Sequence, residues 1–94
     1  MALEAEIEQH FIWAVECAGG KTYKFTSPSM RGVADRIACL PNGDTWFVEL
    51  KRPVGGAFSD QQVVFADDMK RLHQKYVALI TKEEIDQWIR RAMT

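Results

Sequence analysis

The chain is poor in features that define several large classes of protein. It has only two cysteines, Cys17 and Cys39, and nothing in their spacing indicates a disulfide, so we expect two free, buried thiols. No apolar run reaches the roughly 18 residues of a transmembrane helix. The acidic N-terminal segment 1–6 also lacks the features of a signal peptide. A membrane protein and a disulfide scaffold are thereby excluded, and we expect a cytoplasmic location.

The chain also lacks an overall excess of basic charge, because its formal net charge is −1. The charges are nevertheless unevenly distributed. Residues 1–19 contain four acids and no lysine or arginine, whereas residues 20–58 contain six bases and three acids. A local basic region matters more for nucleic-acid binding than the total charge. The middle of the chain therefore remains compatible with a nucleic-acid partner.

The segment from Gly32 to Lys51 contains the most informative pattern. Asp35 opens one apolar run, and a second run, residues 46–48, ends in Glu49-Leu50-Lys51. Residues 41–44 between them, Pro-Asn-Gly-Asp, form a turn sequence, so the two runs predict a hairpin. Such a hairpin brings Asp35 close to Glu49 and Lys51.

These residue types suit a divalent cation acting on a phosphodiester. Alternate side chains of a strand share a face, so Glu49 and Lys51 point the same way while the Leu50 carbonyl stays available. Mg²⁺ prefers oxygen ligands and keeps several waters. Asp35, Glu49 and the Leu50 carbonyl thus form a partial ligand shell, and Lys51 can stabilise negative charge in the transition state. Glu-x-Lys by itself is common, and ordinary strand-end charges are the alternative interpretation.

A further signal follows downstream. Ser59 is a candidate N-cap of a helix whose first turn carries Gln62. The full order, Glu8, Gly32-x-x-Asp35, Phe47-Val48-Glu49-Leu50-Lys51 and Ser59-x-x-Gln62, resembles the VRR-NUC domain. This domain is a branch of the PD-(D/E)xK nuclease superfamily with small stand-alone members in phages and prophages. Ala34 stands where the family usually has proline, which contributes geometry and no ligand.

The resemblance spans nearly the whole chain and implies an α/β, restriction-endonuclease-like fold in a single domain, residues 1–94. The expected order is αβββαβα, with a mixed central sheet flanked by helices. Helices are predicted over residues 3–17, 59–75 and 82–92, and strands over residues 22–26, 36–40, 45–51 and 76–80, the last of them buried. The second helix is expected to bury a stripe of Val63, Phe65, Met69 and Leu72. The third helix is expected to use Ile85, Trp88, Ile89 and Met93.

The resemblance also implies roles for side chains outside the hairpin. An acid on the first helix completes the metal site, and Glu8 is favoured over Glu4. Gln62 orients Lys51 or contacts the scissile phosphate. Expected DNA contacts come from four bases, Lys24, Arg31, Arg36 and Arg52. A solvated surface position is the alternative for each of these residues except Lys51.

The sequence thus predicts a Mg²⁺- or Mn²⁺-dependent DNA endonuclease. The family and the small size favour a homodimer that acts on branched DNA, such as a Holliday junction, with duplex DNA as the other possible substrate. The host-cell cytoplasm is the expected location if the chain is phage-encoded. Two alternatives stay open: a nuclease subunit that needs a partner for DNA targeting, and a non-catalytic DNA-binding module.

Overall fold

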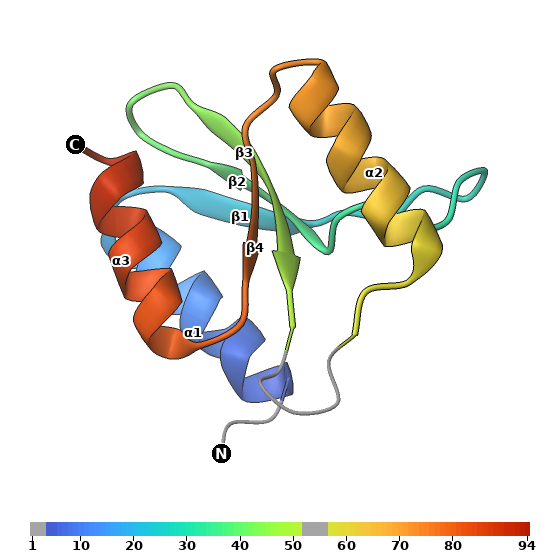
Figure 1. Ribbon diagram of the computed structural model, residues 1–94. Helices are drawn as coiled ribbons and strands as arrows, with labels where there is room; N and C mark the ends of the chain where they lie inside the picture. The colour runs from blue at the N-terminus through green and yellow to red at the C-terminus, as the bar shows by residue number, and fades with distance from the viewer. Residues whose placement is uncertain (1–3, 52–56) are drawn as a thin grey trace.

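A computed structural model describes residues 4–51 and 57–94. Three helices and four strands follow one another in the predicted αβββαβα order (Figure 1). They are α1 (Glu4–Cys17), β1 (Lys21–Lys24), β2 (Arg36–Cys39), β3 (Thr45–Leu50), α2 (Asp60–Arg71), β4 (Tyr76–Leu79) and α3 (Lys82–Ala92). The predicted α/β class with a mixed sheet is confirmed.

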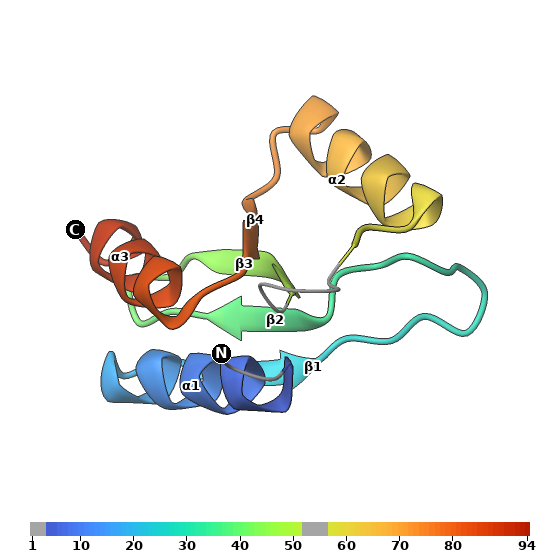
Figure 2. The ribbon, with the colours of Figure 1, turned by 60° about the horizontal axis from the view of Figure 1, so that its bottom comes forward.

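The four strands form one sheet in the order β1-β2-β3-β4. The first three are antiparallel neighbours, and Arg36 of β2 lies opposite Val48 of β3. Strand β4 is parallel to β3, with Glu49 opposite Ala78. A parallel neighbour requires a crossover connection, and α2 supplies it. Figure 2 shows that α1 and α2 consequently lie on opposite sides of the sheet.

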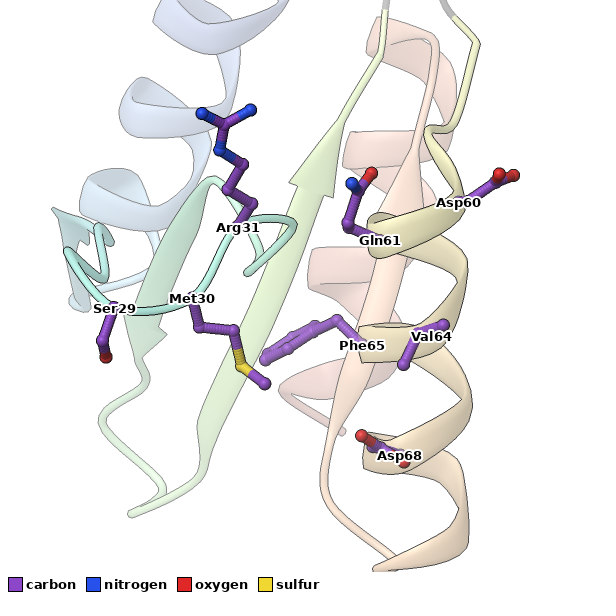
Figure 3. A pocket seen from close by; sticks show the side chains of 8 residues that line it. All are labelled: Ser29, Met30, Arg31, Asp60, Gln61, Val64, Phe65 and Asp68. Carbon is purple, nitrogen blue, oxygen red and sulfur yellow. The ribbon is translucent and has the colours of Figure 1, made fainter.

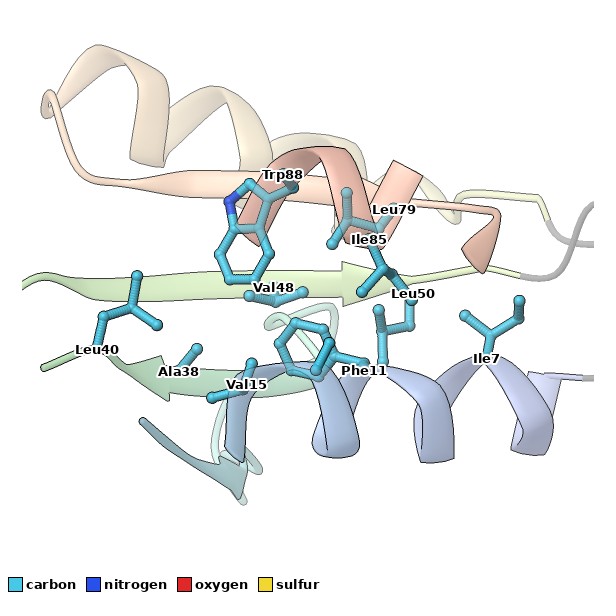
Figure 4. Packing of buried hydrophobic residues seen from close by; sticks show 11 residues of the cluster. Ile7, Phe11, Val15, Ala38, Leu40, Val48, Leu50, Leu79, Ile85 and Trp88 are labelled. Carbon is cyan, nitrogen blue, oxygen red and sulfur yellow. The ribbon is translucent and has the colours of Figure 1, made fainter. Parts of the chain in front are cut away.

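The hydrophobic core lies between the sheet and the layer formed by α1 and α3 (Figure 4). In α1 the buried side chains recur at helical spacing, which is why this segment is an amphipathic helix. Trp88 of α3 packs against Phe11 of α1 at 5.6 Å between ring centroids. The core residues are Ile7, Phe11, Ala14, Val15, Ala38, Leu40, Val48, Leu50, Leu79, Ile85 and Trp88. Ile89 and Met93 pack against this cluster as expected.

The opposite face of the sheet carries a looser aromatic cluster. Phe65 of α2 lies 6.3 Å from Phe25, 5.9 Å from Phe47 and 6.1 Å from Tyr76, measured between ring centroids. None of the twelve residues of α2, all of them described, is fully buried. The prediction of a buried stripe on this helix was therefore wrong. Phe65 and Met69 are half-buried, and Val63 and Leu72 are 47% and 48% exposed.

Several predicted boundaries also need correction. Helix α2 ends at Arg71, because Leu72 caps it and His73 adopts a left-handed φ of 57°. Strand β1 spans residues 21–24 instead of 22–26. In β4 only Leu79 is buried, contrary to the expectation of a buried strand, because β4 is an edge strand of the sheet. Cys17 and Cys39 are free as expected, but both are exposed, contrary to the expectation of burial. No helix within the described ranges is both long and apolar enough to cross a membrane.

Candidate active site

Asp35 lies where the loop from residue 25 enters β2, and it is tied to the neighbouring strand ends. Its backbone carbonyl accepts a hydrogen bond from the Phe25 amide at 3.0 Å. Its carboxylate oxygen Oδ2 accepts one from the Leu50 amide at 2.8 Å. Ala34, directly before it, is fully buried. The hairpin predicted from the sequence thus places Asp35 at the end of β3, beside Glu49 and Leu50.

Glu49 is a buried carboxyl with polar partners on several sides. Its side chain is only 1% exposed. Its Oε2 accepts a hydrogen bond from Gln62 Nε2 at 2.9 Å and lies 3.7 Å from Lys51 Nζ. Burial, then a hydrogen bond with Asp35 and repulsion from its charge, raises the pKa of Glu49 from 4.5 to about 8, against a smaller opposing effect of Lys51. Two carboxyls held this close favour either a shared proton or a cation.

The first turn of α2 delivers Gln62 to this carboxyl. Ser59 caps the helix in a reciprocal capping box: its Oγ accepts from the Gln62 amide at 3.2 Å, and Gln62 Oε1 accepts from the Ser59 amide at 3.0 Å. The side-chain nitrogen Nε2 of Gln62 takes no part in the capping box and donates a hydrogen bond to Glu49. Gln62 therefore contacts Glu49 and not Lys51, which differs from the first of the two roles expected for it.

Gly32 explains how the loop before Asp35 approaches the same helix. Its φ is +83°, and a Cβ atom at this position would lie 2.5 Å from the backbone carbon of Gln61. Only glycine accepts both this conformation and this contact without strain. The Gly32-x-x-Asp35 spacing of the motif therefore brings the loop, the first turn of α2 and the strand ends together.

A small pocket of about 180 Å³ opens on the α1 side of Asp35. It is lined by Glu4, Glu8, Lys24, Asp35 and Leu50. Glu8 Oε2 accepts a hydrogen bond from Arg36 Nε at 3.0 Å, and the Arg36 side chain is only 14% exposed. Arg36 thus pairs with the helix acid, and Lys24 lines the pocket and is exposed. The DNA contacts expected of both residues stay predictions.

No group of three acidic, histidine or cysteine side chains in residues 4–51 and 57–94 converges closely enough to hold a metal ion by itself. The donor set still fits a hard cation. Asp35 connects the buried Glu49 carboxyl with the small pocket. It interacts with Glu49 on one side and lines the pocket with Glu8 on the other. Leu50 also lines that pocket. Carboxylate and carbonyl oxygens are the ligands that Mg²⁺ and Mn²⁺ take.

One expected DNA-binding residue, Arg31, does not line this pocket. Arg31 lines a different hollow, formed by the loop and α2, and points away from that helix in Figure 3. Arg52 lies outside the described residues.

Two aromatic residues near the site were missed by sequence reasoning. Lys51 Nζ lies 5.5 Å from the centroid of the Phe58 ring. Burial, followed by the negative charges of Glu49 and Asp35, raises the pKa of Tyr76 to about 12, so this phenol stays protonated. Tyr76 pairs with Phe47 in the parallel ladder, two residues before Glu49. That pairing arises only when β4 joins the sheet, and no local motif signals it.

Comparison with solved structures defines the class of fold. A structure described as a VRR_NUC domain superposes with a TM-score of 0.86 and covers 93% of this chain and 94% of its own, at 21% sequence identity. The chain therefore has the fold of a VRR_NUC domain, and the resemblance drawn from the motifs is confirmed at the level of the fold. No family model matches the sequence.

A sequence relative makes the comparison more specific. The chain is 52% identical over 50 residues to the protein named "Putative nuclease p44" of Acyrthosiphon pisum secondary endosymbiont phage 1. The match covers 53% of this chain and 54% of the relative, so it spans only about half of either protein. The chain is thus similar to a phage protein named as a nuclease.

Proposed function

We propose that the chain is a metal-dependent DNA endonuclease. The observation that carries this proposal is the convergence of Asp35, Glu49, Lys51 and Gln62 at the C-terminal end of the inner strand β3, on segments far apart in the sequence. The VRR_NUC fold and the relative named as a nuclease support it. A buried acid pair without a cation gives no benefit to a module that only binds phosphate. The arrangement therefore favours catalysis.

In this proposal Asp35, Glu49 and the Leu50 carbonyl hold Mg²⁺ or Mn²⁺, and Glu8 assists. The cation supplies Lewis acidity toward a phosphoryl oxygen and lowers the pKa of a water molecule. Gln62 fixes the orientation of the Glu49 carboxylate through its hydrogen bond of 2.9 Å. Lys51 offers an ammonium group that stabilises the negative charge developing on the phosphate. Lys24, at the mouth of the pocket, contacts the DNA backbone.

The proposed assembly is a homodimer acting on branched DNA. A monomer of 94 residues offers one active site and little surface for DNA. A twofold dimer presents two sites and a larger basic surface, which suits paired cuts on a four-way junction. The proposal includes no base-specific contact. Selectivity among DNA substrates is instead assigned to the shape of the DNA.

The test is a cleavage assay on labelled four-way junction, flap, duplex and single-stranded DNA in Mg²⁺, Mn²⁺ or EDTA. We expect metal-dependent nicking of the junction that Lys51→Ala abolishes. Lys82→Ala is the matched control, because Lys82 lies at the start of α3, away from Asp35 and Glu49, and forms an ion pair with the exposed Glu6 at 4.0 Å. Equal cleavage of all four substrates would support the nuclease assignment and contradict the proposed selectivity for the junction. Folded protein that cuts nothing in either metal would contradict the proposal and favour a subunit that requires a partner.

A further inference from the structure

Helix α2 and the loop beside it expose several apolar side chains. Val63 is 47% exposed, Val64 57% and the capping residue Leu72 48%. Met30, on the loop facing the helix, is 56% exposed. Scattered apolar residues need no explanation, but a contiguous apolar patch with a polar rim usually marks an interaction site. The α2 surface, defined here as Met30, Val64 and the residues around them, is such a patch.

The α2 surface is hollowed. A cavity of about 430 Å³ lies between residues 29–31 of the loop and the helix. Figure 3 shows Met30 and Phe65 pointing toward each other across it, while Asp68 lies beside Val64 on the helix. The charged residues that line it are the acids Asp60 and Asp68 of α2 and one base, Arg31, whose side chain points away from the helix in Figure 3. These carboxylates repel phosphate, so this surface suits a protein and not the DNA substrate.

Charge along α2 indicates what that protein is. Asp60, Val64 and Arg71 are spaced by four and seven residues, so they lie on one face of the helix. Arg71 Nη2 lies 3.3 Å from Asp68 Oδ1 of the same helix. Because Asp68 lines the cavity, Arg71 lies next to the cavity rim. The acid stands at the start of the helix and the base at its end. Two such helices in antiparallel contact bring each Asp60 opposite an Arg71, and a twofold axis makes both contacts identical.

We propose that a second copy of this chain packs on the α2 surface. The two α2 helices run antiparallel, Val64 lies near the twofold axis, and Asp60 faces Arg71 of the partner subunit at both ends. This interface rests on the homodimer of the proposed function and specifies its surface. It leaves the pocket of Glu8, Lys24 and Asp35 free, since that pocket lies on the α1 side of the sheet. It also supports the helix that holds Gln62 against Glu49.

The oligomeric state, measured by sedimentation equilibrium without DNA or metal, tests this interface. We expect the wild-type chain to dimerise, and Val64→Asp to weaken the dimer by about tenfold or more. The control is Val63→Asp, because Val63 is nearly as exposed but lies on another face of the same helix. Circular dichroism and thermal unfolding verify that both variants are folded.

A charge exchange tests the antiparallel arrangement itself. Asp60→Arg places two like charges opposite each other at each end and weakens the dimer. The double variant Asp60→Arg with Arg71→Asp restores opposite charges and recovers the wild-type dissociation constant. A folded wild-type chain that stays monomeric at about 100 μM has no dimer affinity of the usual micromolar or tighter kind and overturns the proposal. Equal effects of Val64→Asp and Val63→Asp, or no recovery in the double variant, overturn it as well. None of these outcomes depends on cleavage, so a failed interface and a failed nuclease assignment are distinguishable.

Discussion

The two faces of the sheet are built differently. The face covered by α1 and α3 is closed to solvent: Val48 of the sheet and Ile7 and Phe11 of α1 are fully buried there. On the face under α2 the aromatic residues are only half-buried, and the acid pair of Asp35 and Glu49 lies at its end. A small domain has little stability to spare. The difference indicates that one face supplies most of the stability and that the other face can therefore hold groups whose mutual repulsion opposes folding.

The largest expected effect separates activity from stability. Asp35→Asn keeps an oxygen that accepts from the Leu50 amide but removes one charge from the acid pair. We expect the cleavage rate to fall by about 100-fold or more, since the loss of a cation ligand costs several kcal/mol of transition-state stabilisation. The melting temperature of the metal-free protein should stay the same or rise, as measured by calorimetry. A large loss of stability would contradict the division between the two faces.

The second prediction compares equivalent aromatic truncations on the two faces. Phe11→Ala removes a fully buried ring of the core and should lower the free energy of unfolding by about 3–5 kcal/mol. Phe65→Ala removes a half-buried ring of the α2 face and should cost about 1–2 kcal/mol. Urea titrations followed by circular dichroism measure both values. Similar losses would mean that the α2 face contributes to stability as much as the core does.

The third prediction concerns the contact between the loop and α2. Gly32→Ala introduces a Cβ atom 2.5 Å from Gln61 in an unfavourable backbone conformation, so the helix or the loop must shift. We expect a destabilisation of about 1–3 kcal/mol and a loss of cleavage larger than this stability change explains. Gly43→Ala is the matched control, because Gly43 also has a positive φ but has open space around it. If both variants lose activity equally, the contact with Gln61 does not position the site.

The last prediction is a dependence of stability on pH in the metal-free protein. The pKa of Glu49 is about 8 in the folded chain and 4.5 is its ordinary value, so the folded state binds the proton more tightly. Its stabilising contribution is therefore complete below about pH 4.5 and is lost as the pH rises toward 8. Unfolding free energies measured between pH 5 and pH 8 should decrease, and Glu49→Gln should remove most of the decrease. Added Mg²⁺ or Mn²⁺ should restore stability at pH 8, because the cation binds the ionised form.

Local sequence predicted most of the secondary structure, and the reason is visible in particular segments. Residues 4–17 repeat apolar side chains at helical spacing, and residues 41–44 contain a strong turn signal. Ser59-x-x-Gln62 is a capping box whose hydrogen bonds lie within four residues. Each of these patterns depends on neighbours along the chain. They were therefore readable without knowledge of the fold.

The wrong predictions concern the burial of side chains, which depends on the distant segments that pack over them. The apolar residues of α2 indicated a helix, but their spacing carries no information on whether the sheet buries them. The motif also did not indicate that Arg36 pairs with Glu8 of α1 at 3.0 Å. The DNA contact expected of Arg36 stays a prediction. The cysteines looked buried because cysteine usually is, and both lie at exposed positions. Burial and ion pairing of this kind depend on segments far away in the sequence.

The sequence by itself determined the order of the elements, the hairpin that aligns Asp35 with Glu49, and the residue types suited to a divalent cation. Those features follow from side-chain periodicity and turn chemistry, which act over a few residues. Only the tertiary structure decided that Gln62 holds Glu49, that Arg36 holds Glu8, and that α2 remains largely uncovered. The position of α2 depends on the parallel pairing of β4 with β3 and on the crossover between them, and the contact of Arg36 with Glu8 depends on the packing of α1 against the other face of the sheet. Such long-range packing determines which side chains meet and which stay exposed.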